Sequence, residues 1–205
     1  MKVNTYTRQQ IQNGYSLVEL SVALSIVAVV IVAGLLGARQ VMLSNTTNNQ
    51  IRESNQTIAK LRKTMASQTD TTGLTNLVAG KLGAWPNDRS ICNDTACTNR
   101  AMFSGAFEYA FTNDAISAMA ANTGVMYVLY KVPTQACADL VNGLNGATVA
   151  LYAGPSAATA PTAGEVPSTA KSVKSGTGSN ISVADLASGC TSSTGLSDIY
   201  AAVQM

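Results

Sequence analysis

The sequence predicts an α+β protein, in which a long N-terminal α-helix, apolar in its first half, packs on a C-terminal, mostly antiparallel β-sheet domain. The first observation is an uncharged apolar run near the N-terminus, and the second is an amphipathic stretch that continues it. The third is a second half of short β-branched and aromatic segments separated by turn-forming residues. A chain of 205 residues has room for one globular domain with such an appendage.

The apolar run contains no charged residue from Leu20 to Ala38. As an α-helix at about 1.5 Å per residue it would span roughly 28 Å, close to the thickness of a bilayer's hydrocarbon core. Lys2 and Arg8 precede the run, and the first fourteen residues contain no acid. The positive-inside rule then keeps the N-terminus in the cytoplasm and places the rest of the chain outside it.

The helix is expected to continue beyond the apolar run, because the polar stretch of residues 44–50 contains no glycine or proline. Apolar residues then recur at steps of seven, three and four, as on one face of a helix. These residues are Ile51, Ile58, Leu61 and Met65. The sequence therefore predicts one helix from about Ser16 to about Ser67, apolar on every side at first and on one face later.

The remainder of the chain predicts a small mixed domain. β-Branched and aromatic segments predict four strands: Glu108–Phe111, Met126–Val132, Thr148–Tyr152 and Ile199–Val203. Pro133–Leu144 is expected to form a short helix between the two central strands, and Ser182–Gly189 another with Ser182 as its N-cap. Gly154–Ser179, rich in Ala, Pro, Gly, Ser and Thr, is predicted as an exposed loop.

The four cysteines predict disulfides. Cys92, Cys97, Cys137 and Cys190 contain no CxxC pair, which disfavours a metal site or a redox motif, and disulfides require an oxidising compartment. Three connectivities are open, and proximity in sequence favours Cys92 with Cys97, which leaves Cys137 with Cys190. The shorter pair is expected in the connection from helix to sheet, with a structural role.

Charge and composition exclude several classes of function. The chain has 13 basic and 11 acidic residues, and removal of Lys2 and Arg8 would leave equal numbers, so we expect no nucleic-acid partner. The absence of histidine removes the commonest general base and zinc ligand, and neither a phosphate-binding nor a dinucleotide-binding glycine motif occurs. We therefore expect no enzyme, metal or cofactor. The basic residues of the long helix are interpreted as its solvated face: Arg52, Lys60, Arg62 and Lys63.

The stretch GYSLVEL, from Gly14 to Leu20, resembles the prepilin signal of type IV pilins when the basic leader and apolar run are considered with it. The resemblance implies that a membrane prepilin peptidase cuts after Gly14 and that Tyr15 becomes the N-methylated first residue. Glu19 is then the fifth residue of the mature chain. Tyr15 replaces the phenylalanine usual in type IVa members, and variation at that position is commoner in type IVb.

Glu19 needs a physical reason, because an unpaired carboxylate in hydrocarbon costs several kcal/mol. In the pilin interpretation, the ammonium of a neighbouring subunit's Tyr15 neutralises it during assembly. The alternative is an acid at the lipid headgroup level that favours the positive end of the helix dipole. Gly34 and Gly37 similarly allow two readings: close helix packing through small residues, or a local stretching of the helix in a filament.

The segment from Cys137 to Cys190 resembles the disulfide-bounded variable region of type IVb pilins, such as the toxin-coregulated and thin conjugative types. The implied organisation is a leader of residues 1–14, a long helix of residues 15–67 whose membrane or filament-core half is residues 15–43, and a head domain of residues 68–205. The implied function is a structural pilus subunit for adhesion, aggregation or conjugative contact. Its partners are identical subunits, the inner membrane, prepilin peptidase and the assembly machinery.

The implied location is the bacterial inner membrane before assembly and the extracellular fibre afterwards. A pseudopilin of type II secretion, a minor pilin and a membrane-anchored periplasmic binding module are the alternatives.

Overall fold

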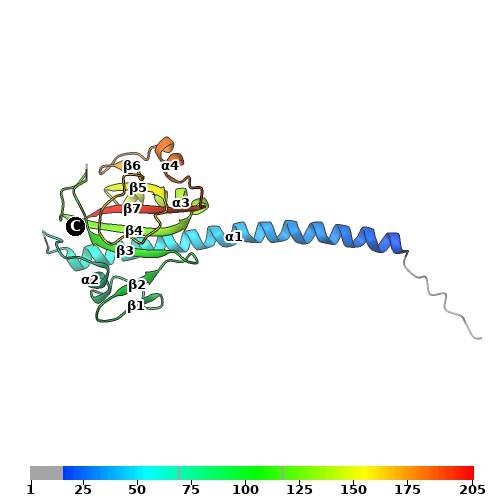
Figure 1. Cartoon of the computed structure of the whole chain (residues 1–205), viewed down its shortest axis with the longest axis horizontal. Coiled ribbons are helices and arrows are strands. Elements are labelled where there is room, and N and C mark those ends of the chain that lie inside the picture. The colour runs from blue at the N-terminus through cyan, green and yellow to red at the C-terminus, as the bar shows by residue number, and fades with distance from the viewer. Residues whose placement is uncertain (1–15, 69, 117) are drawn as a thin grey trace, which may run out of the picture. The chain divides into compact units, whose positions relative to one another are not determined.

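The computed structural model describes residues 16–68, 70–116 and 118–205. Contacts between residues divide the chain into two compact units, Met1–Met42 and Leu43–Met205. One helix, α1 (Leu17–Met65), contributes residues to both units (Figure 1). The predicted helix from about Ser16 to about Ser67 is confirmed to within two residues at each end. Its end is a turn in which the Gln68 N–H donates to the Met65 carbonyl.

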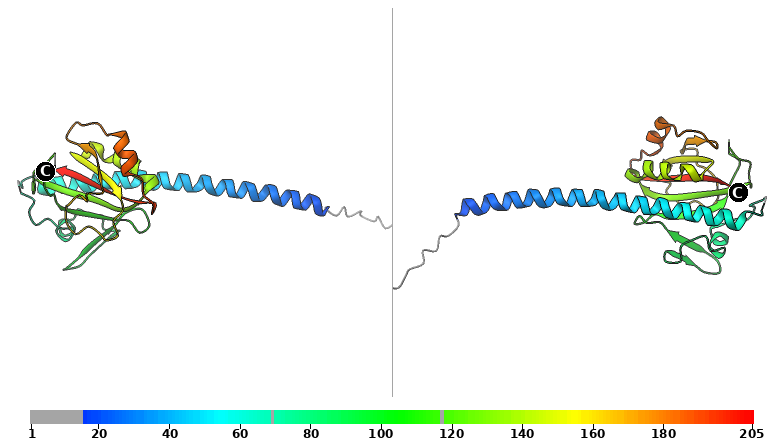
Figure 2. Two further views of the ribbon diagram at one scale, coloured as in Figure 1. Left: turned by 45° about the horizontal axis from the view of Figure 1, so that its top comes forward. Right: turned by 180° about the vertical axis from the view of Figure 1, so that it is seen from behind.

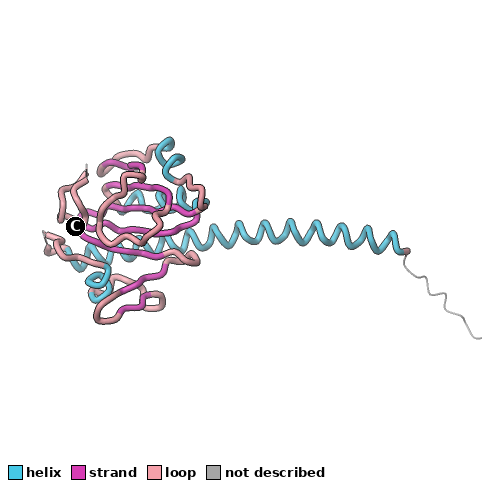
Figure 3. Tube along the Cα trace, in the orientation of Figure 1, coloured by secondary structure: helices cyan, strands magenta, loops and turns pink. Residues whose placement is uncertain are grey.

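The second unit is built on one seven-stranded sheet with the strand order β1-β2-β3-β4-β7-β5-β6 (Figures 1 and 3). All neighbouring strands in the sheet are antiparallel. The strands are β1 (Ser90–Cys92), β2 (Cys97–Arg100), β3 (Phe107–Thr112), β4 (Gly124–Pro133), β5 (Ala150–Pro155), β6 (Lys171–Ser175) and β7 (Leu196–Gln204). The expected α+β class with an antiparallel sheet is confirmed.

The last strand, β7, lies between β4 and β5 and pairs antiparallel with both. β4 and β5 therefore run parallel to each other, and such strands need a crossover connection. Helix α3 (Thr134–Leu144) and the 3₁₀ turn η1 (Asn145–Ala147) provide it. The sequence correctly predicted a helix between these two strands, although it did not predict that the C-terminal strand separates them in the sheet.

The main core lies between one face of the sheet and two helical segments, α3 and the part of α1 in the second unit. Figure 2 shows these two segments on the same side of the sheet. Asn55 of α1 donates through Nδ2 to the Gly143 carbonyl of α3 at 3.2 Å, so the two segments are in direct contact. Ile58 and Leu61 of α1 are buried there, as the predicted apolar stripe requires, and Ile51 is half-buried. Loops cover the other sheet face.

Three short elements were not predicted, and a fourth lies in a segment that the sequence predicted as a loop. Helix α2 (Asn76–Lys81) and strands β1 and β2 occupy the stretch predicted as a connection, and β6 lies inside the predicted loop Gly154–Ser179. These strands carry few β-branched or aromatic residues, and pairing with a neighbouring strand holds them extended. Helix α4 (Val183–Gly189) was predicted, including its cap, since the Ser182 Oγ accepts from the Asp185 N–H at 3.3 Å.

Candidate assembly segment and disulfide-bounded surface

The first part of α1 has an apolar surface that nothing in its own unit covers. Every described residue from Ser16 to Met42 is exposed, including large apolar side chains such as Leu17 at 85% and Val29 at 69%. Helix α1 is long and apolar enough to cross a membrane, a property that a signal sequence shares. Contiguous exposed apolar surface of this kind marks an interaction with lipid or with another protein.

Glu19 lies in the first turn of α1 and is exposed. It is the only acid from Ser16 to Met42. The helix dipole favours a carboxylate in the first turn of a helix. This effect is the alternative to pairing with an ammonium that the sequence left open for Glu19. The predicted cleavage and methylation positions, Gly14 and Tyr15, lie outside the described residues. The expected pairing of Glu19 with an N-terminal ammonium stays a prediction.

Small and polar residues within this segment are accommodated by the helix itself. The Ser21 and Ser25 hydroxyls donate to the carbonyls of Val18 and Val22, each at 2.8 Å, so that neither hydroxyl needs an external partner. The helix is continuous through Gly34 and Gly37 in this structure of a single chain, and a methyl group added at either would meet no heavy atom within 4 Å. The stretched segment was predicted for a filament and remains a prediction.

The second part of α1 is attached to the sheet through a buried polar cluster. Gln50 Nε2 donates to Oε1 of Glu108 on β3, and Asn99 Nδ2 on β2 donates to Oε2 of the same carboxylate at 2.5 Å. The Tyr127 hydroxyl on β4 hydrogen-bonds to the Ser54 hydroxyl at 2.9 Å. Gln50 Oε1 also accepts from the backbone N–H of Met102 at 2.6 Å. Three strands are thereby tied to one helix.

Burial changes the proton affinity of two groups in this cluster. Burial raises the pKa of the Glu108 carboxyl above its ordinary value, against the opposing effect of the hydrogen bonds from Gln50, Tyr127 and Asn99 and of the charge on Arg89. Burial, followed by the charge of Glu108, raises the pKa of the Tyr127 hydroxyl well above its ordinary value. Tyr127 therefore stays neutral at any physiological pH.

Sequence reasoning missed this cluster because it assigned the polar residues of α1 to solvent. Gln50, Ser54 and Thr57 are all at most 1% exposed. Ser54 and Thr57 lie four residues before Ile58 and Leu61, and Gln50 lies four residues before Ser54. Extending the apolar stripe backwards in these steps would have placed all three on the buried face. Of the basic residues predicted to be solvated, Arg52, Lys60 and Lys63 are exposed, whereas Arg62 is half-buried. Its Nη2 donates to the Ala147 carbonyl at 2.8 Å.

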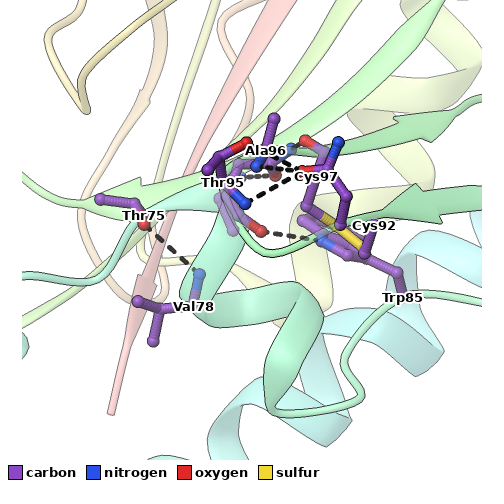
Figure 4. Close-up of a disulfide and its surroundings, with 10 residues drawn as sticks. Thr75, Val78, Trp85, Cys92, Thr95, Ala96 and Cys97 are labelled. Atoms are coloured by element: carbon purple, nitrogen blue, oxygen red, sulfur yellow. Dashed lines mark hydrogen bonds between the residues drawn. A yellow bond between two sulfur atoms is a disulfide. The ribbon is translucent and has the colours of Figure 1, made fainter.

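The Cys92–Cys97 disulfide closes the β1–β2 hairpin at the edge of the sheet (Figure 4). The two cysteines are directly opposite in the strand register. Asn93 stabilises the four-residue turn between the two cysteines. Its Oδ1 accepts from the N–H groups of Thr95 and Ala96 at 3.0 and 2.7 Å. Helix α2 packs directly on the sulfurs, because a methyl group added at Gly80 would collide with both. The hairpin thus packs on α2 through its disulfide.

The Cys137–Cys190 disulfide joins α3 to the end of α4, with Cα atoms 5.6 Å apart. Both disulfides are the pairings that proximity in sequence favoured. The chain between these two cysteines includes β5, β6 and α4, so the bounded region forms one edge of the sheet rather than a separate loop. Among the described residues, no group of three His, Cys, Asp or Glu side chains could hold a metal ion.

Comparison with known proteins gives two matches of different kinds. The family model for the prokaryotic N-terminal methylation motif matches residues 10–35, the stretch that contains Gly14, Tyr15 and Glu19. No curated protein matches the sequence of the chain. Among solved structures, the chain is similar to the crystal structure of a type IV b pilin from Salmonella typhi, with a TM-score of 0.53 and 15% sequence identity. The match covers 77% of this chain and 99% of that one.

The chain thus combines the N-terminal methylation motif with a fold similar to that of a type IV b pilin.

Proposed function

We propose that the chain is a major structural subunit of a type IVb-like pilus. A prepilin peptidase removes residues 1–14, Tyr15 is N-methylated, and the subunits polymerise through their N-terminal helices. Before assembly the apolar part of α1 lies in the bacterial inner membrane, with the N-terminus in the cytoplasm. After assembly the same surface lies among sister helices in an extracellular fibre, whose outer surface serves adhesion, aggregation or conjugative contact.

The observation that carries this proposal is the exposed apolar stretch of α1, whose first half lies within the methylation motif. Every large apolar side chain from Leu17 to Met42 is more than half exposed, and each methylene removed from water contributes about 0.8 kcal/mol. Lipid and a bundle of sister helices are both apolar surroundings that would cover this surface. Glu19 would meet an ammonium in the bundle, where neutralisation makes a buried carboxylate tolerable.

The test is the N-terminus of the mature protein together with electron microscopy of the cells that produce it. A major pilin is expected to yield abundant fibres whose subunits begin at methylated Tyr15. A minor pilin or a secretion pseudopilin would be processed at the same bond without forming abundant fibres of its own. A membrane-anchored binding module would retain residues 1–14, and a mature chain that begins at Met1 or Lys2 would overturn the proposal.

A further inference from the structure

A loop of residues 156–170 joins β5 to β6 and covers the sheet face that α1 and α3 leave free (Figure 1). Its Val166 and Ala170 pack on the apolar cluster of this face, which includes Tyr200 of β7. An open cavity of about 410 Å³ is lined by this loop and by Tyr200. Small-molecule sites have volumes of about 300–1,000 Å³, so the cavity is large enough for a small ligand.

The loop is held on the sheet at its start and in its middle. The Ala157 N–H donates to Asp198 Oδ2, and the Ala157 carbonyl accepts from the Tyr130 hydroxyl, both at 2.9 Å. Further along, Gly164 forms a β-bridge with Asn113, which directly follows β3. The wall of the cavity is therefore fixed before any ligand arrives, which lowers the entropic cost of binding.

The polar side chains that line the cavity have no partners of their own. Tyr200 is only 3% exposed, yet its hydroxyl makes no hydrogen bond within the described part of the chain. The same holds for the hydroxyls of Thr159, Thr162 and Ser168 and for the carboxylate of Glu165. A buried tyrosine normally finds a partner for its hydroxyl, so the vacant hydrogen-bonding groups favour a ligand that can pair with them.

The lining also restricts the charge of that ligand. Glu165 is the one acid in it, and within the described residues no Lys or Arg side chain lines the cavity. Burial, followed by the charge of Asp198, raises the pKa of the Tyr200 hydroxyl, which therefore stays protonated and can donate. An anionic ligand would be repelled by Glu165, and an apolar ligand would leave the hydroxyls unpaired.

A neutral sugar ring has the chemistry that remains. Each of its hydroxyls both donates and accepts, as the threonine, serine and tyrosine hydroxyls do, and a carboxylate accepts from it. Its C–H groups need an apolar surface, which the alanines and prolines of the loop supply. Sites for small ligands combine such apolar surface with a few polar groups in this way.

We infer that the cavity between the β5–β6 loop and β7 binds a neutral pyranose, with Tyr200 and Glu165 as its main hydrogen-bonding groups. The inference goes beyond the proposed function, because a single head could bind a sugar without polymerising. The site also lies within the region bounded by Cys137 and Cys190 except for Tyr200, which follows that region directly on β7.

Saturation-transfer NMR on the full chain, in a detergent without a sugar headgroup, tests the site. The probes are D-glucose, D-galactose, D-mannose and N-acetyl-D-glucosamine. At least one is expected to bind with a Kd of about 1 mM, as befits a ligand of this size. Its uronate is expected to bind about tenfold more weakly, because Glu165 repels a second carboxylate. Equal binding of its methyl glycoside would identify the end of a glycan as the source, and loss on methylation the free sugar.

Tyr200→Phe removes only the unpartnered hydroxyl and is expected to weaken binding about tenfold. Tyr152→Phe is the matched control, since Tyr152 is directly opposite Tyr200 in the strand register, is also buried and does not line the cavity. It should leave the affinity unchanged. Glu165→Gln, on the exposed loop, should remove the disadvantage of the uronate, whereas Asp185→Asn should not.

Three results would overturn the inference: no saturation transfer to any of the four sugars, binding that Tyr200→Phe leaves unchanged, or a uronate that binds as well as the neutral sugar. None of them bears on the proposed pilus subunit, because the measurement uses the unpolymerised chain. Cells without fibres would overturn that proposal and leave the sugar site intact.

Discussion

Two stretches of the same helix differ in which side chains they expose and which they bury. From Leu17 to Met42 of α1 the side chains are mostly apolar and all are exposed, whereas from Leu43 to Met65 polar side chains such as Gln50 and Ser54 are fully buried. The usual rule places apolar residues inside and polar residues outside. Both stretches depart from that rule: the first exposes apolar side chains, and the second buries polar ones. The second stretch finds its polar partners, Glu108 and Tyr127, in the same chain.

Under the proposed function, the second stretch is stabilised within its own chain and the first by lipid or by neighbouring subunits. Contacts of the second stretch are intramolecular, so changing them should alter the stability of the head. In the first stretch every large apolar side chain is more than half exposed within its unit, so changing it should alter membrane insertion or polymerisation and leave the unfolding of the head unchanged. Variants that affect both properties equally would contradict this division.

The largest effect is expected for Glu19→Ala. Removing one member of a buried charge pair costs about 2–5 kcal/mol, which reduces assembly by more than tenfold. Membrane insertion should be retained or improved, because the span loses a charge. Fibre counts by electron microscopy and the amount of protein in the membrane fraction measure the two quantities. Ser21→Ala is the control, since that hydroxyl is satisfied within its own helix.

Normal assembly of the Glu19→Ala variant would show that Glu19 has no pairing role. The acid would then be a headgroup-level residue that only favours the helix dipole, an effect of about 0.3–1 kcal/mol. A variant that fails to reach the membrane would also contradict the expectation, because the loss of fibres would then have a different cause.

Gln50→Ala tests the second stretch. It removes the donor to Glu108 and the acceptor for the Met102 N–H, and it leaves buried polar groups without partners, each of which costs about 1–3 kcal/mol. We expect a loss of about 2–4 kcal/mol in the free energy of unfolding, measured by thermal denaturation of the full chain in detergent. Gln56→Ala, on the exposed face of the same helix, should stay within about 0.5 kcal/mol of wild type.

Equal stability of the Gln50→Ala and Gln56→Ala variants would mean that the buried cluster does not hold the helix on the sheet. Fibre yield gives the second half of the comparison. If Gln50→Ala lowers stability while the folded protein assembles with wild-type yield, the two stretches act separately, as proposed.

A smaller effect is expected for the pH dependence of stability, to which Glu108 contributes one component. Because burial raises its pKa in the folded state, the folded protein binds this proton more tightly than the unfolded chain does. The contribution of Glu108 to stability is therefore greatest below the ordinary glutamate pKa of about 4.5 and falls as the pH rises through the raised value. Glu108→Gln should remove this component, and the difference between the two unfolding profiles across that range measures it.

Asn99 can adapt to Glu108→Gln, so this substitution removes the titrating group without leaving an unpaired donor. The Asn99 Oδ1 is buried and has no hydrogen-bond partner within the described residues, so rotation of its amide would let it accept from the new side-chain NH₂. Burial also raises the pKa of Asp198, with the same sign of pH dependence. Asp198→Asn is therefore needed to separate the two contributions. Unchanged profiles for Glu108→Gln would show that Glu108 does not titrate differently in the two states.

The parts of this fold that the sequence predicted are those with a strong local pattern. An uncharged run and a stripe at helical spacing predicted α1, and dense β-branched and aromatic residues predicted β4 and β7. The order of the strands was not predictable in this way, because the place of β7 between β4 and β5 depends on pairing across the whole head. Strands β1, β2 and β6 contain few β-branched or aromatic residues and are kept extended by pairing with neighbouring strands.

The residues of the candidate site also differ in whether the sequence alone could select them. Glu19 and the four cysteines were found because position in a motif and type of residue were sufficient to select them. Gln50 and Glu108 were missed, because a buried polar residue differs from a solvated one only through a partner 58 residues away in sequence. A carboxylate predicted at the start of a strand gives no sign that an amide on a distant helix will bind it.

The smallest effect is expected at Gly34 and Gly37, and it tests whether the exposed stretch changes conformation with its surroundings. In a single chain, replacing both by alanine should stabilise the helix by about 1 kcal/mol per site, because nothing crowds either position. If the helix stretches in the fibre, backbone amides from Ala33 to Ala38 should lose protection from hydrogen exchange on assembly, and the double variant should assemble a few-fold less well. Retained protection in wild-type fibres would favour close helix packing instead. The alanine variant alone cannot separate these readings, since added methyl groups would hinder both stretching and packing, so amide exchange in wild-type fibres decides between them.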